Sequence, residues 1–438
     1  MSSGVRGRCE HRDAARGMIP SEGTREQSSR SHGGALEAFR VANFARYFVG
    51  QLVSNTGTWF QNLAISLIVV QVTGSASALA LVTVAQFGPI LLLAGVAGRL
   101  ADTVSPRSIL AATSACSIVV TCGLAVAVAQ ESPSLPWIYG LIVLSGCFHA
   151  FERVAAQAFI FELVGAELLR NAVVLSTVYI SAARSIGPGL AGLAFLAVGP
   201  AACLLINAAT YLAVLVAVLL IRPGDLHARI RPEGRGPSVR ENLRAIRSNR
   251  ALVVILVVNV VVTLAAMNMN VVLTSTVSLG FGGDAGELGA AHALNAVGAV
   301  VGGVLLARYA RLGASTLVPA CLLFSATLAV NAAAPSLLLF LFAAPLLGIG
   351  IGVYQGVLSG AAQGESEPHA LGRTMSLVTL GQQGVAPLGA LLVGVLIDVT
   401  SGQAALGVGA AVTACCGLAV YLALVRGRAR TPERESGG

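Results

Sequence analysis

The feature that most constrains this chain is a series of twelve apolar runs, each 20 to 29 residues long. Several of the breaks between them are short and contain glycine, proline, serine or threonine. The runs cover residues 47–71, 76–98, 108–129, 137–161, 172–198 and 201–221, and then 251–279, 288–307, 314–333, 336–361, 374–397 and 404–425. A helix that crosses a bilayer needs about 20 mostly apolar residues. With 55% hydrophobic and 11% charged residues and a mean hydropathy of +0.79, the chain is not a soluble protein. The pattern predicts an all-α membrane protein with twelve transmembrane helices.

Polar stretches divide the chain into two halves of six helices each. The expected organisation is a disordered cytoplasmic tail at 1–46, a first half at 47–221, a cytoplasmic linker at 222–250, a second half at 251–425 and a cytoplasmic tail at 426–438. Residues 239–246 of the linker carry arginines on one side and predict a short amphipathic surface helix. The halves resemble each other weakly at an offset of about 200 residues, as in Gly187-Pro188-Gly189 and Ala386-Pro387-Leu388-Gly389. Many secondary transporters are built by such duplication around a site near the midplane.

The arginines indicate which side of the membrane each loop occupies. Twenty-six of the 28 basic residues fall in segments that share one side if the twelve helices alternate, and the opposite loops contain none. Those opposite loops hold Glu131, Asp284 and Glu287, and Asp398 ends the eleventh run. The positive-inside rule therefore places both termini in the cytoplasm of a bacterial plasma membrane protein. Because the arginines that produce the net charge of +8 lie in loops on one side of the membrane, we expect no nucleic-acid partner. We also expect the protein to be a monomer embedded in the lipid bilayer.

Several kinds of chemistry are excluded by what the sequence lacks. All basic residues are arginines, so the chain has neither the lysine of a Walker A phosphate loop nor a lysine for a Schiff base. The eight cysteines lie outside the expected outer loops and show no metal-ligand spacing. No catalytic motif is present. We therefore expect no enzyme activity, no cofactor, no metal site and no disulfide.

The expected cytoplasmic turn between the second and third helices carries a recognisable motif, Gly98-Arg99-Leu100-Ala101-Asp102 followed by Arg107. It resembles the loop signature of the major facilitator superfamily at Gly98, Asp102 and Arg107. In that family the glycine allows close helix contact, and the aspartate pairs across the gate between the two halves. The alternative interpretation is an ordinary capped turn.

Longer tracts resemble one branch of this superfamily, the enterobactin exporters and macrolide efflux proteins. The tracts are Gly50 to Gln61, Ala150 to Asn171, Ala183 to Pro188, Leu205 to Ala208 and Gly372 to Ser376, and the resemblance runs from about residue 40 to residue 425. It implies two six-helix halves that rock about a central cavity. It also implies export of a small molecule.

A polar stripe on the fourth helix is the main mechanistic candidate. His149, Glu152, Arg153 and Gln157 share one helical face, and ionisable groups at membrane depth are costly, so this face should contact protein or water. Glu152 either exchanges protons during transport or simply pairs with Arg153 or Arg170 near the cytoplasm. Arg184, near the middle of the fifth helix, pairs with Glu152 or binds an anionic group of the substrate.

Two further groups complete the candidate site. Gly187, Pro188, Gly189 and Gly192 form a Gly-Pro tract like that of efflux members of the family, and predict a kinked helix packed closely at the contact between halves. Candidate cavity residues, on the helices that line the cavity in that family, are Asn55, Trp59, Gln61, Asn62, Gln157, Asn268, Asn270, Tyr354 and Gln355. Taken singly, each polar member of this set is equally explained by hydrogen bonds between helices. The glycine pairs at 298 and 302 and at 352, 356 and 360 are expected to be plain packing faces.

These observations favour a secondary active transporter that exports a small amphipathic molecule, with inward proton flow as the energy source. The cargo classes left open are drugs and antibiotics, siderophores and other secondary metabolites, so multidrug resistance and siderophore export are both possible roles. An importer or uniporter on the same fold is the alternative, since fold does not determine direction. A non-transporting membrane sensor with a sealed interior is the third hypothesis.

Overall fold

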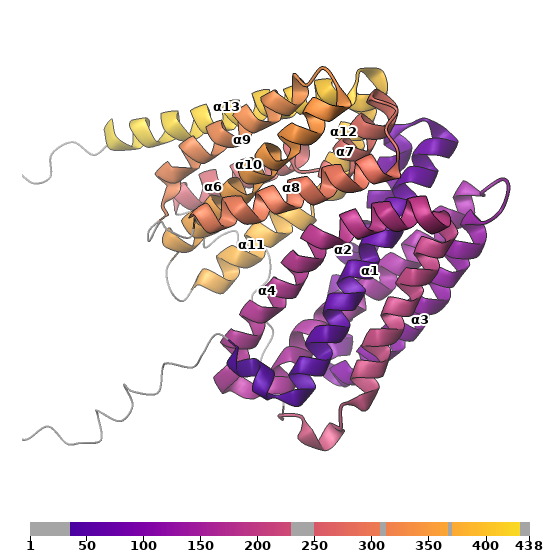
Figure 1. Cartoon of the computed structure of the whole chain (residues 1–438). Coiled ribbons are helices and arrows are strands. Elements are labelled where there is room, and N and C mark those ends of the chain that lie inside the picture. The colour runs from indigo at the N-terminus through magenta and orange to yellow at the C-terminus, as the bar shows by residue number, and fades with distance from the viewer. Residues whose placement is uncertain (1–35, 229–248, 307–311, 367–369, 430–438) are drawn as a thin grey trace, which may run out of the picture.

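The computed structural model describes residues 36–228, 249–306, 312–366 and 370–429, and within these ranges every regular element is a helix (Figure 1). The first part of the chain forms η2 (Glu37–Arg40), α1 (Ala42–Thr73), α2 (Ala76–Thr103), α3 (Pro106–Val128), α4 (Leu135–Leu220) and η3 (Pro223–Asp225). The second part forms α6 (Arg250–Ala266), α7 (Met269–Ser275), η4 (Thr276–Gly280), α8 (Ala285–Leu306), η5 (Ala314–Thr316), α9 (Leu317–Ala332), α10 (Leu337–Gly364), α11 (Leu371–Gln383), α12 (Ala386–Val399) and α13 (Gly402–Ala429).

The longest element, α4, is three helices joined at two sharp breaks. Its 86 residues contain non-helical backbone only at Gly165 (φ 70°) and Gly199 (φ 79°). Glycine has no Cβ and adopts positive φ without the penalty that other residues incur. The two glycines therefore reverse the chain and divide α4 into a first segment (135–164), a second segment (166–198) and a third segment (200–220).

The described helices account for the twelve predicted crossings. Nine of them are long and apolar enough to span a membrane. One of the nine is α4, which contributes three crossings once it is divided at its breaks. A further crossing comes from α1, whose 32 residues would span about 48 Å at 1.5 Å per residue. The predicted fold class is therefore confirmed.

Local sequence explains where several helices begin and end. Gly74 closes α1 in the left-handed conformation, with φ 61°, and its N–H donates to the carbonyl of Val70. The Ser75 hydroxyl then accepts a hydrogen bond from the Ala78 N–H and caps α2. Ser105 caps α3 in the same way, and Pro106 occupies the first turn, where no N–H is needed.

Some predicted boundaries are wrong. The tail expected at 1–46 ends earlier, because the chain is helical from Glu37 and its aromatic side chains pack together there, with the Phe39 and Phe48 ring centroids 4.8 Å apart. At the other end, α13 continues to Ala429, beyond the expected end at 425. The amphipathic helix expected at 239–246 lies outside the described residues, as does most of the 222–250 linker.

Two long apolar runs are divided in the structure. The run at 251–279 becomes α6 and α7, with Asn268 at the break, and its last turn is the π-helix η4. The run at 374–397 becomes α11 and α12, with Pro387 in the first turn of α12. An apolar run predicts that a segment crosses the membrane, but it carries no signal for an interruption within that segment.

The helices pack as two bundles (Figure 1). In the first bundle, α1, α2 and α3 pack on α4; in the second, α8 and α9 pack on α10, and α13 packs on α6 and α9. The two bundles contact each other mainly through α2 with α12 and through α4 with α8. This division follows the two halves predicted from the sequence.

The contact between α8 and α10 depends on glycine. A Cβ on Gly298, Gly302, Gly348 or Gly352 would collide with backbone atoms of the other helix, since it would meet Pro345, Ile349, Asn295 and Ala299 respectively. Small residues allow helix backbones to approach closely inside a membrane, where van der Waals packing drives association. The packing role predicted for the glycines at 298, 302 and 352 is confirmed.

Gly348→Ala should reduce the free energy of unfolding by about 1–3 kcal/mol, because the added methyl group overpacks the contact with the Asn295 carbonyl. Thermal unfolding of the purified protein in detergent measures this effect. The matched control is Gly303→Ala in the same helix pair, since nothing lies within 4 Å of the added Cβ. The control should unfold at or slightly above the wild-type temperature because alanine favours a helix. Equal destabilisation by both variants would contradict this account.

Candidate functional site

The bundle has two chemically different ends. The ends of α2 and α11 that carry Arg99 and Arg373, and the starts of α3 and α6 with Arg107 and Arg250, define what we call the arginine-rich end. The opposite turns, which include Gly74 to Ser75 and the break at Gly199, define the arginine-poor end. The described turns at that end contain no arginine.

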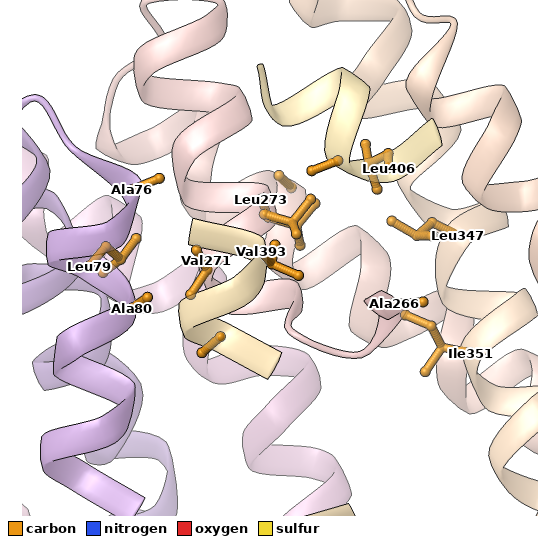
Figure 2. Close-up of a cluster of buried hydrophobic side chains, with 14 of the residues drawn as sticks. Ala76, Leu79, Ala80, Ala266, Val271, Leu273, Leu347, Ile351, Val393 and Leu406 are labelled. Atoms are coloured by element: carbon orange, nitrogen blue, oxygen red, sulfur yellow. The ribbon is translucent and has the colours of Figure 1, made fainter. Parts of the chain in front are cut away.

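Near the arginine-poor end the two bundles are in close contact. A Cβ on Gly192 would lie 2.7 Å from the Ala285 carbonyl oxygen, and a Cβ on Gly394 would lie 2.9 Å from the Ser77 Cα. Figure 2 labels Ala76, Leu79 and Ala80 of α2, together with Val271 of α7 and Val393 of α12 in the same buried cluster. This apolar contact belongs to a core that extends into both bundles.

Toward the arginine-rich end the cover over α2 is lost. Ala80 is 0% exposed, whereas Leu91, about three helical turns further along the same face of α2, is 38% exposed. Nothing lies within 4 Å of a Cβ on Gly98, about five turns from Ala80. The direct hydrogen bond between bundles in this region joins the Arg153 guanidinium to the Gln383 Oε1, at 3.1 Å. Both of those side chains are at least partly accessible. The contact between bundles is therefore concentrated at one end.

The loop motif lies at the less covered end. Asp102 is exposed and has no hydrogen bond or ion pair within the described residues. Gly98 has nothing within 4 Å of the position of a Cβ, so it makes no close helix contact in this state. Arg107 binds within its own bundle, where it donates 3.0 Å hydrogen bonds to the carbonyls of Val218 and Leu219. In this state, then, the motif does not bridge the two bundles.

Glu152 lies deep in the first segment of α4, near three tyrosines and a histidine. It precedes the break at Gly165 by 13 residues, which is about 20 Å of helix. Three tyrosines and His149 are close enough to interact electrostatically with its carboxylate; the tyrosines are Tyr47, Tyr179 and Tyr211. His149 Nε2 lies 3.0 Å from the Tyr211 hydroxyl, which joins the first and third segments of α4.

The ion pairs expected for Glu152 do not form. Within the described residues, no arginine lies within 4.0 Å of its carboxylate, so the proposed pairs with Arg153, Arg170 and Arg184 are absent. Arg153 instead points to Gln383 of the second bundle. Arg184 is exposed near the middle of the second segment of α4 and has no hydrogen bond or ion pair among the described residues. The helical spacing of the sequence predicts that Glu152 and Arg153 share one side of their helix. It gives no distance from Glu152 to side chains on other helices.

The Gly-Pro tract lies at the contact of three helices. A Cβ on Gly187 would lie 2.8 Å from the Trp59 Cγ of α1, and one on Gly189 would lie 3.6 Å from the Ala293 Cβ of α8. Pro188 is accommodated within a helix that stays regular on both sides of it. Trp59 also faces α8, since its ring centroid lies 6.0 Å from that of His292. The tract therefore packs where the two bundles meet, together with Gly192.

Three candidate cavity residues meet at one small polar cavity. Gln61, Asn62 and Asn270 line a space of about 10 Å³, which has room for about one water molecule. The remaining lining residues are Ile65, Ser66, Val82, Gln86 and Ile142. The Asn270 amide donates to the Ser66 hydroxyl at 3.4 Å, and the Gln86 amide donates to Asn62 at the same distance. Side chains from both bundles thus form one cluster of neutral hydrogen-bonding groups.

Other candidates have structural partners instead. The Asn55 amide donates to Gln51 one turn earlier, and the Asn268 amide donates to the carbonyl of Thr263 at 3.1 Å. Tyr354 is 1% exposed and stacks on Phe324 inside the second bundle. The two remaining candidates, Gln157 and Gln355, have no hydrogen bond among the described residues; Gln157 is exposed and Gln355 is half-buried.

Sequence reasoning missed a buried junction within the first bundle. The Gln61 Oε1 accepts hydrogen bonds from the Asn207 amide at 2.9 Å and the Thr121 hydroxyl at 3.3 Å. All three side chains are at most 4% exposed. Each amide was visible in an apolar run, but nothing in the sequence indicated that α1, α3 and the third segment of α4 would meet there. No cluster of three potential metal ligands occurs among the described residues.

Comparisons with known sequences agree with this geometry. The family model described as transmembrane secretion effector matches residues 33–436 of the chain. No curated protein gives a significant sequence match.

Solved structures with the same arrangement of helices are numerous. A bacterial homologue of the human lysosomal transporter Spinster, in an inward-facing and unoccupied conformation, superposes with a TM-score of 0.63 at 14% identity over 88% of this chain and 96% of its own. The nucleoside transporter NupG gives a TM-score of 0.66 at 10% identity, over 87% and 99%. A POT family transporter in complex with a thioalcohol-conjugated peptide gives 0.70 at 10% identity, over 88% and 96%. At such identities the likeness concerns the fold alone.

Gln61→Leu should reduce the free energy of unfolding by about 1–3 kcal/mol, because Asn207 and Thr121 lose their shared acceptor while they remain buried. Thermal unfolding in detergent again gives the measurement. Gln157→Leu is the control, since Gln157 is exposed and donates no hydrogen bond among the described residues. An unchanged unfolding temperature for Gln61→Leu would show that the junction adds no stability.

Proposed function

Because this chain belongs to the transmembrane secretion effector family of the major facilitator superfamily, we propose that it is a secondary active transporter that exports a small amphipathic molecule by proton antiport. The observation that carries the proposal is Glu152, a carboxylate at membrane depth with three tyrosines and a histidine around it and no arginine paired to it. The fold provides two helical bundles that can move relative to each other, and Glu152 provides a carboxylate that can bind a proton.

The distribution of contacts between the bundles supports alternating access. The apolar contact of α2 with α12 closes the arginine-poor end, and α2 loses its cover toward the arginine-rich end. If the arginine-rich end faces the cytoplasm, as the positive-inside rule requires, both termini are cytoplasmic and the present state is open inward. Asp102 then lies on the open side and gains a partner in the other half only when that side closes.

Glu152 suits proton coupling because of what surrounds it. An unpaired negative charge at membrane depth is unfavourable, so binding of a proton removes a cost that no arginine within 4.0 Å offsets among the described residues. Tyrosine hydroxyls and His149 can donate hydrogen bonds to the carboxylate or accept one from the acid. The glutamate can therefore be held in either protonation state. In an antiport cycle, protons bind from outside, and cargo binds in the inward-open state after their release.

The side chains along the cavity favour a cargo that is partly polar and partly apolar. Asn62, Gln86 and Asn270 provide neutral donors and acceptors at the closed end, and Trp59 provides an aromatic surface beside them on α1. Exposed Arg184 would contact an acidic group on the cargo. Drugs, antibiotics, siderophores and other secondary metabolites all contain such combinations.

Direction is a separate part of the proposal. Vesicles of opposite orientation, supplied with an amphipathic dye such as ethidium in the outside medium, distinguish export from import or uniport on the same fold. Export by antiport predicts dye uptake into inside-out vesicles with an acidic lumen, and none into right-side-out vesicles in an acidic medium, since both gradients are acidic on the face opposite the cytoplasm. The reverse pattern would assign the chain as an importer, and dye movement that ignores the gradient would assign it as a uniporter.

Glu152→Gln should abolish the part of ethidium export that an uncoupler inhibits, because the amide cannot bind and release a proton at neutral pH. The measurement is dye efflux from loaded cells with and without the uncoupler. Glu131→Gln is the matched control, as Glu131 is an exposed glutamate in the turn between α3 and α4. That variant should export dye like the wild type. Export by Glu152→Gln that stays fully sensitive to the uncoupler would remove Glu152 from the mechanism.

A further inference from the structure

One carboxylate links the two bundles at the arginine-poor end. Asp398, in the last turn of α12, accepts three hydrogen bonds from the start of α2. Its Oδ1 accepts from the Ala76 N–H at 2.6 Å, and its Oδ2 accepts from the Ser77 N–H at 3.0 Å and the Ser75 hydroxyl at 2.8 Å. The donors belong to the first bundle and the acceptor to the second, so these bonds break if the bundles separate at this end.

The chemistry of this contact favours a charged acceptor. The first N–H groups of a helix have no partner within the helix, and the N-terminus carries a partial positive charge. Hydrogen bonds to an ionised group are shorter and stronger than those between neutral groups. Asp398 therefore serves as a second cap on α2, in addition to Ser75 of α2's own bundle.

Apolar packing between α12 and α2 determines where the Asp398 carboxylate lies. Gly394, one turn earlier on α12, brings the backbone so close that its Cβ would lie 2.8 Å from both the Ala76 carbonyl oxygen and the Ala80 Cβ. Leu79 and Val393 belong to the same buried cluster (Figure 2). The close approach of α12 to α2 places the carboxylate over the end of α2. Asp102, at the opposite end of α2, has no such partner.

We propose that Asp398 is a positioning residue of the transport cycle, which holds the arginine-poor end closed by capping α2 from the other bundle. The proposal rests on the proposed function only in that the two bundles rock against each other. Opening of this end requires all three hydrogen bonds to break, and closing re-forms them. Asp398 thereby biases the protein toward the state that is open at the arginine-rich end.

The test measures accessibility at both ends in a variant whose native cysteines are replaced by alanine. Ala80→Cys reports on the arginine-poor end, because Ala80 is buried where α2 meets α12. Gln157→Cys reports on the other end, because Gln157 is exposed one turn from Arg153, which contacts the second bundle. Each reporter is labelled with a membrane-impermeant maleimide in nanodiscs, where both faces of the protein are accessible. The readout needs no substrate and no proton gradient.

Asp398→Asn should raise the labelling rate of the Ala80→Cys reporter about tenfold and lower that of the Gln157→Cys reporter. The amide loses the charge and presents a single acceptor oxygen to three donors. Asp398→Glu keeps the charge but displaces it by one methylene, so its effect should have the same direction and be smaller. Glu131→Gln, which neutralises another acidic residue between helices at the same end, should leave both rates unchanged.

Opposite changes at the two ends separate a gate from a structural contact, since simple loosening of the protein would raise both rates. Equal rates in Asp398→Asn and wild type, or an increase at both ends, would overturn the proposal. A variant that fails to remain monodisperse is replaced by Asp398→Glu, for which the same two outcomes apply. Because the proton-coupling experiment measures transport and this one measures exposure, either can fail without the other.

Discussion

The bilayer requires every backbone polar group and every charge at its centre to find a partner within the protein or in a water-filled space. This constraint accounts for the described architecture, in which every regular element is a helix and the chain reverses in short turns between helices. It also requires the few polar side chains within the membrane-spanning helices to have polar partners. Glu152 lies within electrostatic range of tyrosines and a histidine of its own bundle. Gln61 accepts hydrogen bonds from Asn207 and Thr121 of its own bundle.

The two bundles are held together unequally. Near the arginine-poor end, glycine positions at 192 and 394 allow backbones to touch, and a carboxylate from α12 caps α2. Toward the other end, a hydrogen bond joins the exposed Arg153 to the half-buried Gln383. Asp102 there has no hydrogen bond or ion pair among the described residues. Apolar packing inside a membrane is not strengthened by exclusion of water, so a few polar contacts at the helix ends can decide which end is closed.

The fold could be predicted from the sequence because the thickness of the bilayer sets the length of each apolar run. The arginines in alternate loops also indicate which loops share one side of the membrane. Glycine positions in α8 and α10 were correctly assigned to packing, since close approach needs small residues. The same sequence could not reveal that Glu152 has no arginine partner, because helical spacing gives a face but no distance to the next helix. The breaks at Asn268 and Gly384, and the cap that Asp398 places on a helix more than 300 residues away, depend on tertiary contacts that no local pattern encodes.

The central claim is that one end of the molecule opens as the other closes. Spin labels on α2 and α11 at Thr103 and Ser376 report on the arginine-rich end, and labels at Gln130 and Thr400 report on the arginine-poor end. Double electron–electron resonance in nanodiscs, recorded across a range of pH, measures both separations. The account predicts that the first distance shortens as the second lengthens. Two distances that stay fixed, or that change in the same direction, would contradict it.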